Sequence, residues 1–264
     1  QAVPMEALLD LEPDAVLSIG GQWISKKPKQ HLRALEIKKH VHIDIFQCWD
    51  VLDAEVLHLR MASNALAVWK SAPEFICISY ESPVSKPVPW SDAAAFQAVV
   101  SKLKTTDVLH LGNSSIVRYF NYFPKAVQLY GDRGVAGIDG SLSTAVGAAL
   151  ADPDRKHFLI IGDQSFLYDH NGLYGQKIPQ NLIICVLNNG VGGIFDWLPG
   201  RASTGPTAQR VFANAQHVNL KGIASAFSVG YQAVSSVEAL VEALDTAVGP
   251  KIIDSKTEQH VNLA

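Results

Sequence analysis

His157-Phe-Leu-Ile-Ile-Gly-Asp163 is an apolar run that stops at a glycine and a carboxylate. A second apolar run, Asn181-Leu-Ile-Ile-Cys-Val-Leu187, stops at the amide pair Asn188 and Asn189. Both runs predict strands that are buried on both faces, as in a parallel sheet. Because the carboxyl ends of parallel strands meet at one edge of the sheet, we expect Asp163 and Asn189 to converge at a ligand crevice there.

These two side chains offer oxygen ligands of different charge. Asp163 supplies an anionic oxygen and Asn189 a neutral amide oxygen, a mixture that Mg²⁺ or Ca²⁺ accepts while phosphate and water oxygens fill the other positions. Softer metals would favour Cys or His instead. Either pair on its own is also typical of a turn that closes a strand. The two pairs together predict a site for a metal ion that carries a diphosphate.

The composition is that of an ordinary globular protein. The 264 residues are 48% hydrophobic with a net charge of −3, which allows one or two domains and gives no reason to expect nucleic-acid binding. Cys48, Cys77 and Cys185 lack the paired spacing of metal ligands, so we expect reduced thiols. No apolar run is long enough for a membrane span, and the first six residues do not resemble a signal peptide. We therefore expect a cytoplasmic protein.

Strand patterns alternate with helical patterns along the chain, which favours an α/β fold of two three-layer domains with mainly parallel sheets. Three prolines between Glu81 and Trp90 predict a linker. Ser91 or Asp92 then caps a helix, so we place the domain boundary between residues 90 and 91. The expected elements of the first domain are strands over 15–19, 41–45, 56–59 and 75–78 and helices near 29–35 and 64–70.

The second domain shows six strand patterns and a well-marked helix. The helix spans 235–244 and begins with Ser235-x-x-Glu238, which resembles a capping box. The expected strands are 108–111, 127–130, 157–161, 182–187, 231–234 and 251–254.

Asp163 and Asn189, separated by a helix and a strand, resemble the diphosphate-binding motif of thiamine diphosphate (ThDP) enzymes, in which Gly-Asp-Gly is followed by Asn-Asn. Gln164 replaces the third glycine. Three further segments, residues 112–118, 132–147 and 188–195, are similar to one branch of this superfamily, which works in menaquinone biosynthesis. The resemblance covers most of residues 10–200.

The resemblance implies that residues 91–264 form the diphosphate-binding domain and residues 1–90 the central, transhydrogenase-III-like domain with its linker. Enzymes of this family also have an N-terminal pyrimidine-binding domain, whose glutamate contacts the aminopyrimidine ring. No segment of the chain resembles that domain. We therefore expect a fragment that folds but does not turn over alone.

The implied cofactors are ThDP and Mg²⁺ or Mn²⁺. The resemblance assigns the metal to Asp163, Asn189 and the carbonyl of Val191, which stands where the family usually has glycine. Gln164 and Ser165 begin the helix that follows Asp163, and the free N–H groups at the start of this helix would meet the diphosphate. Ile138 resembles the bulky apolar residue that holds the two cofactor rings bent together. The cofactor-binding set is Gly137, Ile138, Asp139, Gly162, Asp163, Gln164, Ser165 and Asn189.

The implied substrates are 2-oxoglutarate and isochorismate, which carry two carboxylates each, so basic side chains should line the pocket. Arg118, Arg133, Lys26 and Lys27 fit this role, although Lys27 replaces an arginine of the family and lacks its bidentate fork. Ser114 should hydrogen-bond the substrate or a reaction intermediate. An apolar wall that excludes water is expected from Ile194, Phe195 and Leu198.

The resemblance implies that 2-oxoglutarate is decarboxylated and that the succinyl semialdehyde unit is added to isochorismate. It also implies a homodimer or homotetramer, and we expect neither nucleic acid nor a membrane as partner. Two alternatives stay open at this point. One is an acetolactate-synthase-like enzyme that uses smaller 2-oxo acids, against which the Arg118 and Arg133 motifs argue. The other is a non-catalytic diphosphate-binding module.

Overall fold

The computed structural model describes residues 12–19, 26–45, 52–62, 89–175, 178–197 and 205–258. The chain divides into two compact units. The first in chain order spans Val3–Pro83, and the second comprises Val84–Ala264 together with residues 1 and 2. The division falls within the proline-containing stretch before the expected boundary at residue 90. Each unit has its own parallel sheet.

The first unit contains a three-stranded parallel sheet in the order β1-β2-β3. Helix α1 follows β1 and packs Leu32 into a small core with Ile37 and Leu52. The second strand lies two residues earlier than its predicted range of 41–45. The predicted helix at 64–70 and strand at 75–78 lie outside the described residues, as do Cys48 and Cys77. The elements are β1 (Ala15–Ile19), α1 (Lys26–Ala34), β2 (Lys39–Ile43) and β3 (Glu55–Leu59).

The second unit contains a six-stranded sheet in the order β5-β4-β6-β7-β9-β8, and every neighbouring pair is parallel. The predicted α/β fold with parallel sheets is therefore confirmed. All six predicted strands are present, with ends that differ by at most two residues from the predicted ranges. They are β4 (Val108–Leu111), β5 (Gln128–Gly131), β6 (His157–Gly162), β7 (Leu182–Asn188), β8 (Gly230–Val234) and β9 (Lys251–Lys256).

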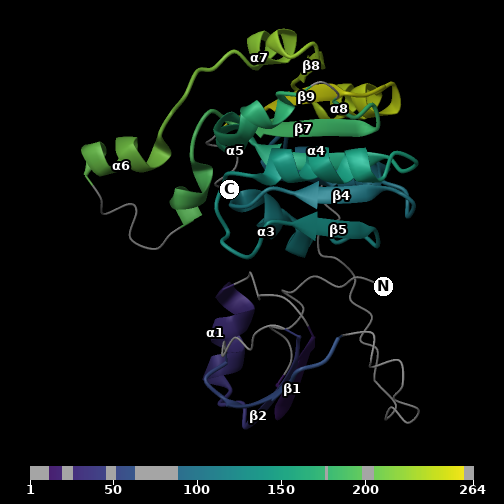
Figure 1. Ribbon diagram of the computed structural model, residues 1–264. Helices are drawn as coiled ribbons and strands as arrows, with labels where there is room; N and C mark the ends of the chain where they lie inside the picture. Colours follow the sequence, from purple (N-terminus) through teal and green to yellow (C-terminus); the bar gives the residue numbers. More distant parts are fainter. Residues whose placement is uncertain are drawn as a thin grey trace. The chain divides into compact units, whose positions relative to one another are not determined.

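Helices cover both faces of this sheet, and in Figure 1 α4 lies across one of them. On that face, Leu142 of α4, Phe166 of α5 and Leu220 of α7 share a buried core with alternate residues of β6 and β7. On the other face, α2 contacts β7 and α8. The helices are α2 (Asp92–Lys102), α3 (Ser115–Tyr122), α4 (Ser141–Ala151), α5 (Asp163–Asp169), α6 (Pro206–Ala213), α7 (Leu220–Ala226) and α8 (Val237–Asp245), with 3₁₀ turns η3 (His170–Leu173) and η4 (Gly193–Trp197).

Serine caps begin two of these helices. Ser91 accepts a hydrogen bond from the backbone N–H of Ala94, which confirms the predicted start of α2. The capping box predicted at Ser235 is wrong by one residue, because Ser236 has the extended backbone and accepts from the N–H of Ala239. A capping oxygen reaches the N–H two or three positions into the helix, so the backbone turn at Ser236 decides which serine caps α8.

The order of the strands creates a crevice beside β4. The chain passes from β4 to β5 on one side and then crosses to β6 on the other side of β4. The connection after β4 therefore runs to β5 on one side, whereas the connection after its neighbour β6 runs to β7 on the other side. Such a switch point opens a crevice at the carboxyl ends of these two strands.

Two buried histidines stack between β4 and β6. Nε2 of His110 and Nδ1 of His157 are 2.9 Å apart, and the ring centroids are 5.2 Å apart. Burial lowers the pKa of His110 to about 4, and the charge of His157 acts in the same direction. The folded chain therefore holds His110 neutral.

We expect acid to destabilise the chain through His110. The unfolded chain takes up this proton near pH 6.5, so it binds more protons than the folded chain between pH 6.5 and about 4. The free energy of unfolding consequently falls as the pH falls through this window, by roughly 2 kcal/mol between about pH 7.5 and about pH 5. Urea unfolding at both pH values should show a loss that is smaller by about this amount in His110→Gln. An equal loss in the variant would contradict the assignment, and His217→Gln at an exposed site is the control.

Candidate active site

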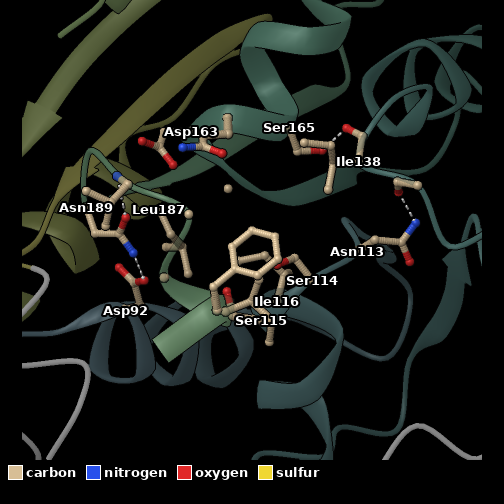
Figure 2. Close-up of a pocket in the computed structure, with 18 of the residues that line it drawn as sticks. Asp92, Asn113, Ser114, Ser115, Ile116, Ile138, Asp163, Ser165, Leu187 and Asn189 are labelled. Atoms are coloured by element: carbon tan, nitrogen blue, oxygen red, sulfur yellow. Dashed lines mark hydrogen bonds between the residues drawn. The ribbon is translucent and has the colours of Figure 1, made fainter. Parts of the chain in front are cut away.

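A cavity of about 280 Å³ opens at the carboxyl ends of β4, β6 and β7 (Figure 2). Loops that follow these strands, together with residues 136–138 ahead of α4, form its walls. Most of the site residues expected from the sequence therefore share one cavity. Those that line it are Ser114, Gly137, Ile138, Gly162, Asp163, Gln164, Ser165, Asn189, Val191, Ile194 and Phe195.

The other expected residues lie elsewhere. Asp139 is exposed, and neither Arg118 nor Arg133 belongs to the cavity lining. Lys26 and Lys27 begin α1 in the first unit, and their side chains lie outside the described part of the chain. Leu198 also lies outside it.

Asp163 is a buried carboxylate at the junction of β6 and α5, with 3% of its surface exposed. Burial raises the pKa of Asp163 to about 6, a hydrogen bond from Gln216 opposes this rise, and the charge of Asp92 adds to it. No lysine, arginine or histidine forms an ion pair with Asp163 among the described residues. A buried carboxylate without a basic partner is costly, and a bound cation would remove that cost.

Asn189 is held on both sides of its amide. Its Nδ2 donates to Asp92 Oδ2 at 2.7 Å, and its Oδ1 accepts from the backbone N–H of Val191 at 3.0 Å (Figure 2). The other oxygen of Asp92 accepts from the Thr257 hydroxyl, so the buried Asp92 is itself fixed. These bonds turn the amide oxygen of Asn189 toward the loop that contains Val191.

The substitution of glycine by valine at position 191 meets no backbone obstacle. The positive φ of this loop, +76°, belongs to Gly190, and Val191 is not among the described residues with positive φ. The Val191 carbonyl accepts from the Gly193 N–H at 3.0 Å and has a second lone pair for another partner.

The donors of this cavity fit a hard cation. Asp163, Asn189 and the Val191 carbonyl all offer oxygen, which Mg²⁺ and Mn²⁺ prefer. A cluster of three or more His, Cys, Asp or Glu able to hold a metal does not occur within the described ranges. The oxygen set contains only one carboxylate, so it differs in kind from such a cluster.

Two residues of the cavity wall have strained backbones. Ser114 has φ 66° and ψ −129°, and Ala136 has φ 62°, a region that favours glycine. Such strain costs on the order of 1–3 kcal/mol and persists where the surrounding structure imposes it, often at functional sites. Ser114 makes no side-chain capping hydrogen bond to α3, so its hydroxyl is not used to start the helix.

Arg118 and Arg133 both bond the loop that contains Asn113 and Ser114. Arg118 donates to the Ser114 carbonyl, and Arg133 donates to Asn113 Oδ1. Burial lowers the pKa of Arg118, and the charge of Arg133 lowers it further. Neither guanidinium forms an ion pair with an acid in the described ranges, and the buried Nε of Arg133 has no hydrogen-bond partner. Such a pair suits an anionic group.

The sequence patterns missed three residues that hold the site together. Asp92 bonds Asn189, Asn113 bonds the loop that contains Gly137, and Gln216 bonds Asp163. Asn113 Nδ2 donates to the carbonyl of Gly137 at 2.5 Å, and Gln216 Nε2 donates to Asp163 Oδ2 at 2.7 Å. Each partner lies far away in sequence, so no local spacing signals these bonds.

Comparison with known proteins gives a consistent picture. Residues 111–255 match the family described as "Thiamine pyrophosphate enzyme, C-terminal TPP binding domain". A Flavobacterium psychrophilum protein named 2-succinyl-5-enolpyruvyl-6-hydroxy-3-cyclohexene-1-carboxylate (SEPHCHC) synthase is 31% identical over 96% of this chain and 49% of its own length. Proteins of the same name from Bacteroides thetaiotaomicron and Bacteroides fragilis are 32% and 34% identical over 98% and 91% of this chain. They are covered over 49% and 45% of their own lengths. The chain thus spans about half the length of the curated relatives it matches.

Proposed function

The chain belongs to the thiamine pyrophosphate (ThDP) enzyme family, and on that premise we propose that it forms the diphosphate-binding part of a SEPHCHC synthase. The observation that carries this proposal is the meeting of Asp163, Asn189 and Val191 in one cavity, where a buried carboxylate lacks a basic partner within the described residues. The similarity to three proteins with that name supports SEPHCHC synthase over other enzymes of the family.

We propose that Asp163, Asn189 and the Val191 carbonyl hold Mg²⁺ or Mn²⁺, with the diphosphate beside them. Gly162, Gln164 and Ser165 would bind the diphosphate, since the first N–H groups of a helix have no partner within the helix. Gly137, Ile138 and Asp139 would complete the cofactor site. The Ser165 hydroxyl donates to the Ile138 carbonyl, which links these two segments (Figure 2).

When bound, ThDP supplies the electron sink for decarboxylation and carbon–carbon bond formation. The chain itself supplies position and charge. Arg118 and Arg133 would bind substrate carboxylates, and we propose the same role for Lys26 and Lys27. The Ser114 hydroxyl would hydrogen-bond the substrate, and Ile194, Phe195 and Leu198 would exclude water.

The proposed reaction consumes 2-oxoglutarate and isochorismate and releases carbon dioxide. We propose that residues 1–90 form a central domain, that residues 91–264 form the diphosphate-binding domain and that activity requires a pyrimidine-binding domain. A homodimer or homotetramer in the cytoplasm, without nucleic-acid or membrane partners, completes the proposal. Within the described residues, the helices are too short or too polar to cross a bilayer.

We expect the full-length protein, supplied with ThDP and Mg²⁺, to convert 2-oxoglutarate and isochorismate into SEPHCHC. Mass spectrometry of the product and release of one carbon dioxide per product would check this. Turnover of pyruvate without turnover of 2-oxoglutarate would instead indicate an enzyme for smaller 2-oxo acids. Absence of ThDP binding would contradict the cofactor site itself.

A further inference from the structure

The last residue of α6 and the first residues after it lie against the candidate metal site. We call residues 213–216 the strap. The Gly192 N–H donates to the Ala213 carbonyl at 2.6 Å, and the Gln216 N–H donates to the Gly190 carbonyl at 2.9 Å. A Cβ at Gly192 would lie 2.9 Å from the Phe212 carbonyl oxygen, so glycine permits this close approach. The strap is therefore bonded to the same loop that offers the Val191 carbonyl.

Two glutamines join the strap to the start of α5, where Asp163 lies. Gln164 Nε2 donates to the carbonyls of Ala213 at 3.3 Å and Asn214 at 2.9 Å. In the opposite direction, Gln216 Nε2 reaches from the strap to Asp163 Oδ2 at 2.7 Å. Gln164, the residue that departs from the Gly-Asp-Gly motif, thus bonds the strap through its side chain.

The Gln216 side chain is fixed at both ends of its amide. Its Oε1 accepts from the Val218 N–H at 2.7 Å, which leaves Nε2 directed at Asp163. A carboxylate can otherwise rotate about its terminal torsion, which is broad and weakly restricted. The bond from Gln216 therefore limits the orientations open to the Asp163 carboxylate.

We propose that Gln216 is a positioning residue that orients the Asp163 carboxylate for metal binding, and that Gln164 anchors the strap from which Gln216 reaches it. This inference rests on the proposed metal site. Hydrogen-bond partners of metal ligands typically change metal affinity about 10- to 100-fold when they are removed. The strap thus connects the start of α5, which contains Asp163, to the loop that contains Val191.

The test measures Mn²⁺ binding to the full-length protein in the presence of ThDP, by electron paramagnetic resonance of free and bound Mn²⁺. Methionine resembles glutamine in length and lacks the amide, so Gln216→Met removes the bond with little loss of volume. We expect Gln216→Met to weaken Mn²⁺ binding about 10-fold and to change the spectrum of bound Mn²⁺. Gln164→Met, which leaves Gln216 in place and removes hydrogen bonds to neutral carbonyls, should weaken binding about threefold. The control is Gln180→Met, at an exposed glutamine before the amino end of β7.

The outcomes separate this inference from the proposed function. If the wild-type protein binds no Mn²⁺, the metal site itself is wrong. If the wild type binds Mn²⁺ and both variants bind it with the same affinity and the same spectrum, the roles of Gln216 and Gln164 are overturned. Thermal unfolding of each variant shows whether it folds. If Gln216→Met does not fold, unchanged Mn²⁺ affinity in Gln164→Met overturns the proposal, because a strap without its anchor should no longer hold Gln216 against Asp163.

Discussion

Asp163→Asn should abolish the metal-dependent binding of thiamine diphosphate. The carboxylate is the one anionic donor of the candidate metal set, and asparagine keeps its shape while removing its charge. A divalent cation held by oxygen ligands loses much of its attraction when that charge is removed, so the affinity should fall by at least about 100-fold. Calorimetric titration with ThDP and Mg²⁺ measures the change.

The folded state of this variant should remain intact. Burial raises the pKa of Asp163 to about 6, so the ionised form costs free energy in the metal-free chain at neutral pH. The melting temperature of Asp163→Asn without metal should therefore be no lower than that of the wild type. Asp107→Asn alters another buried aspartate, before β4 at the opposite end of the sheet, and should leave ThDP binding unchanged. Wild-type affinity in Asp163→Asn would refute the metal site.

Arg133→Met should raise the KM for 2-oxoglutarate in the full-length protein about 10- to 100-fold, because hydrogen bonds to charged groups contribute roughly 1.5–3 kcal/mol. The unpartnered Nε of Arg133 and the adjacent Arg118 form a positive pair without an acidic partner in the described ranges. Methionine retains the apolar stem and removes the charge. Steady-state kinetics with varied 2-oxoglutarate measures the effect.

A separate measurement distinguishes substrate binding from support of the loop. Arg133 also donates to Asn113, so a purely structural role would weaken ThDP binding as well as substrate binding. We expect the affinity for ThDP and Mg²⁺ to stay within about twofold of the wild type, a change of less than roughly 0.5 kcal/mol. Arg155→Met, at an arginine that bonds the Thr106 carbonyl at the amino end of the sheet, is the matched control. An unchanged KM in Arg133→Met would contradict the carboxylate role.

The strands of the second unit could be predicted because their residues repeat a simple physical requirement. Strands buried on both faces need continuous apolar runs, and β6 and β7 are such runs. The two runs end at Asp163 and Asn189, and the ends of adjacent parallel strands meet at one edge of the sheet, which is why these two residues could be placed near each other without a structure. Element ends were less certain, as the capping serine of α8 shows, because adjacent serines offer the same side chain.

The surroundings of the site were only partly predictable. Arg118 and Arg133 were expected among the basic side chains of the pocket, and in the structure they bond Ser114 and Asn113, which line the cavity. Position after a strand sets the end of the sheet at which a side chain lies, and the fold of the loop then sets its direction. The sequence roles of Lys26, Lys27 and Leu198 stay predictions.

By itself, the sequence determined the parallel α/β architecture and the pairing of a carboxylate with an amide at adjacent strand ends. Both follow from local periodicity, which needs no knowledge of distant contacts. Only the tertiary structure decided that Asp92 holds Asn189, that Gln216 holds Asp163 and that Gln164 holds the strap. These bonds join residues far apart in the chain, and hydrogen bonds of 2.7–2.9 Å depend on how the loops pack after the sheet has formed.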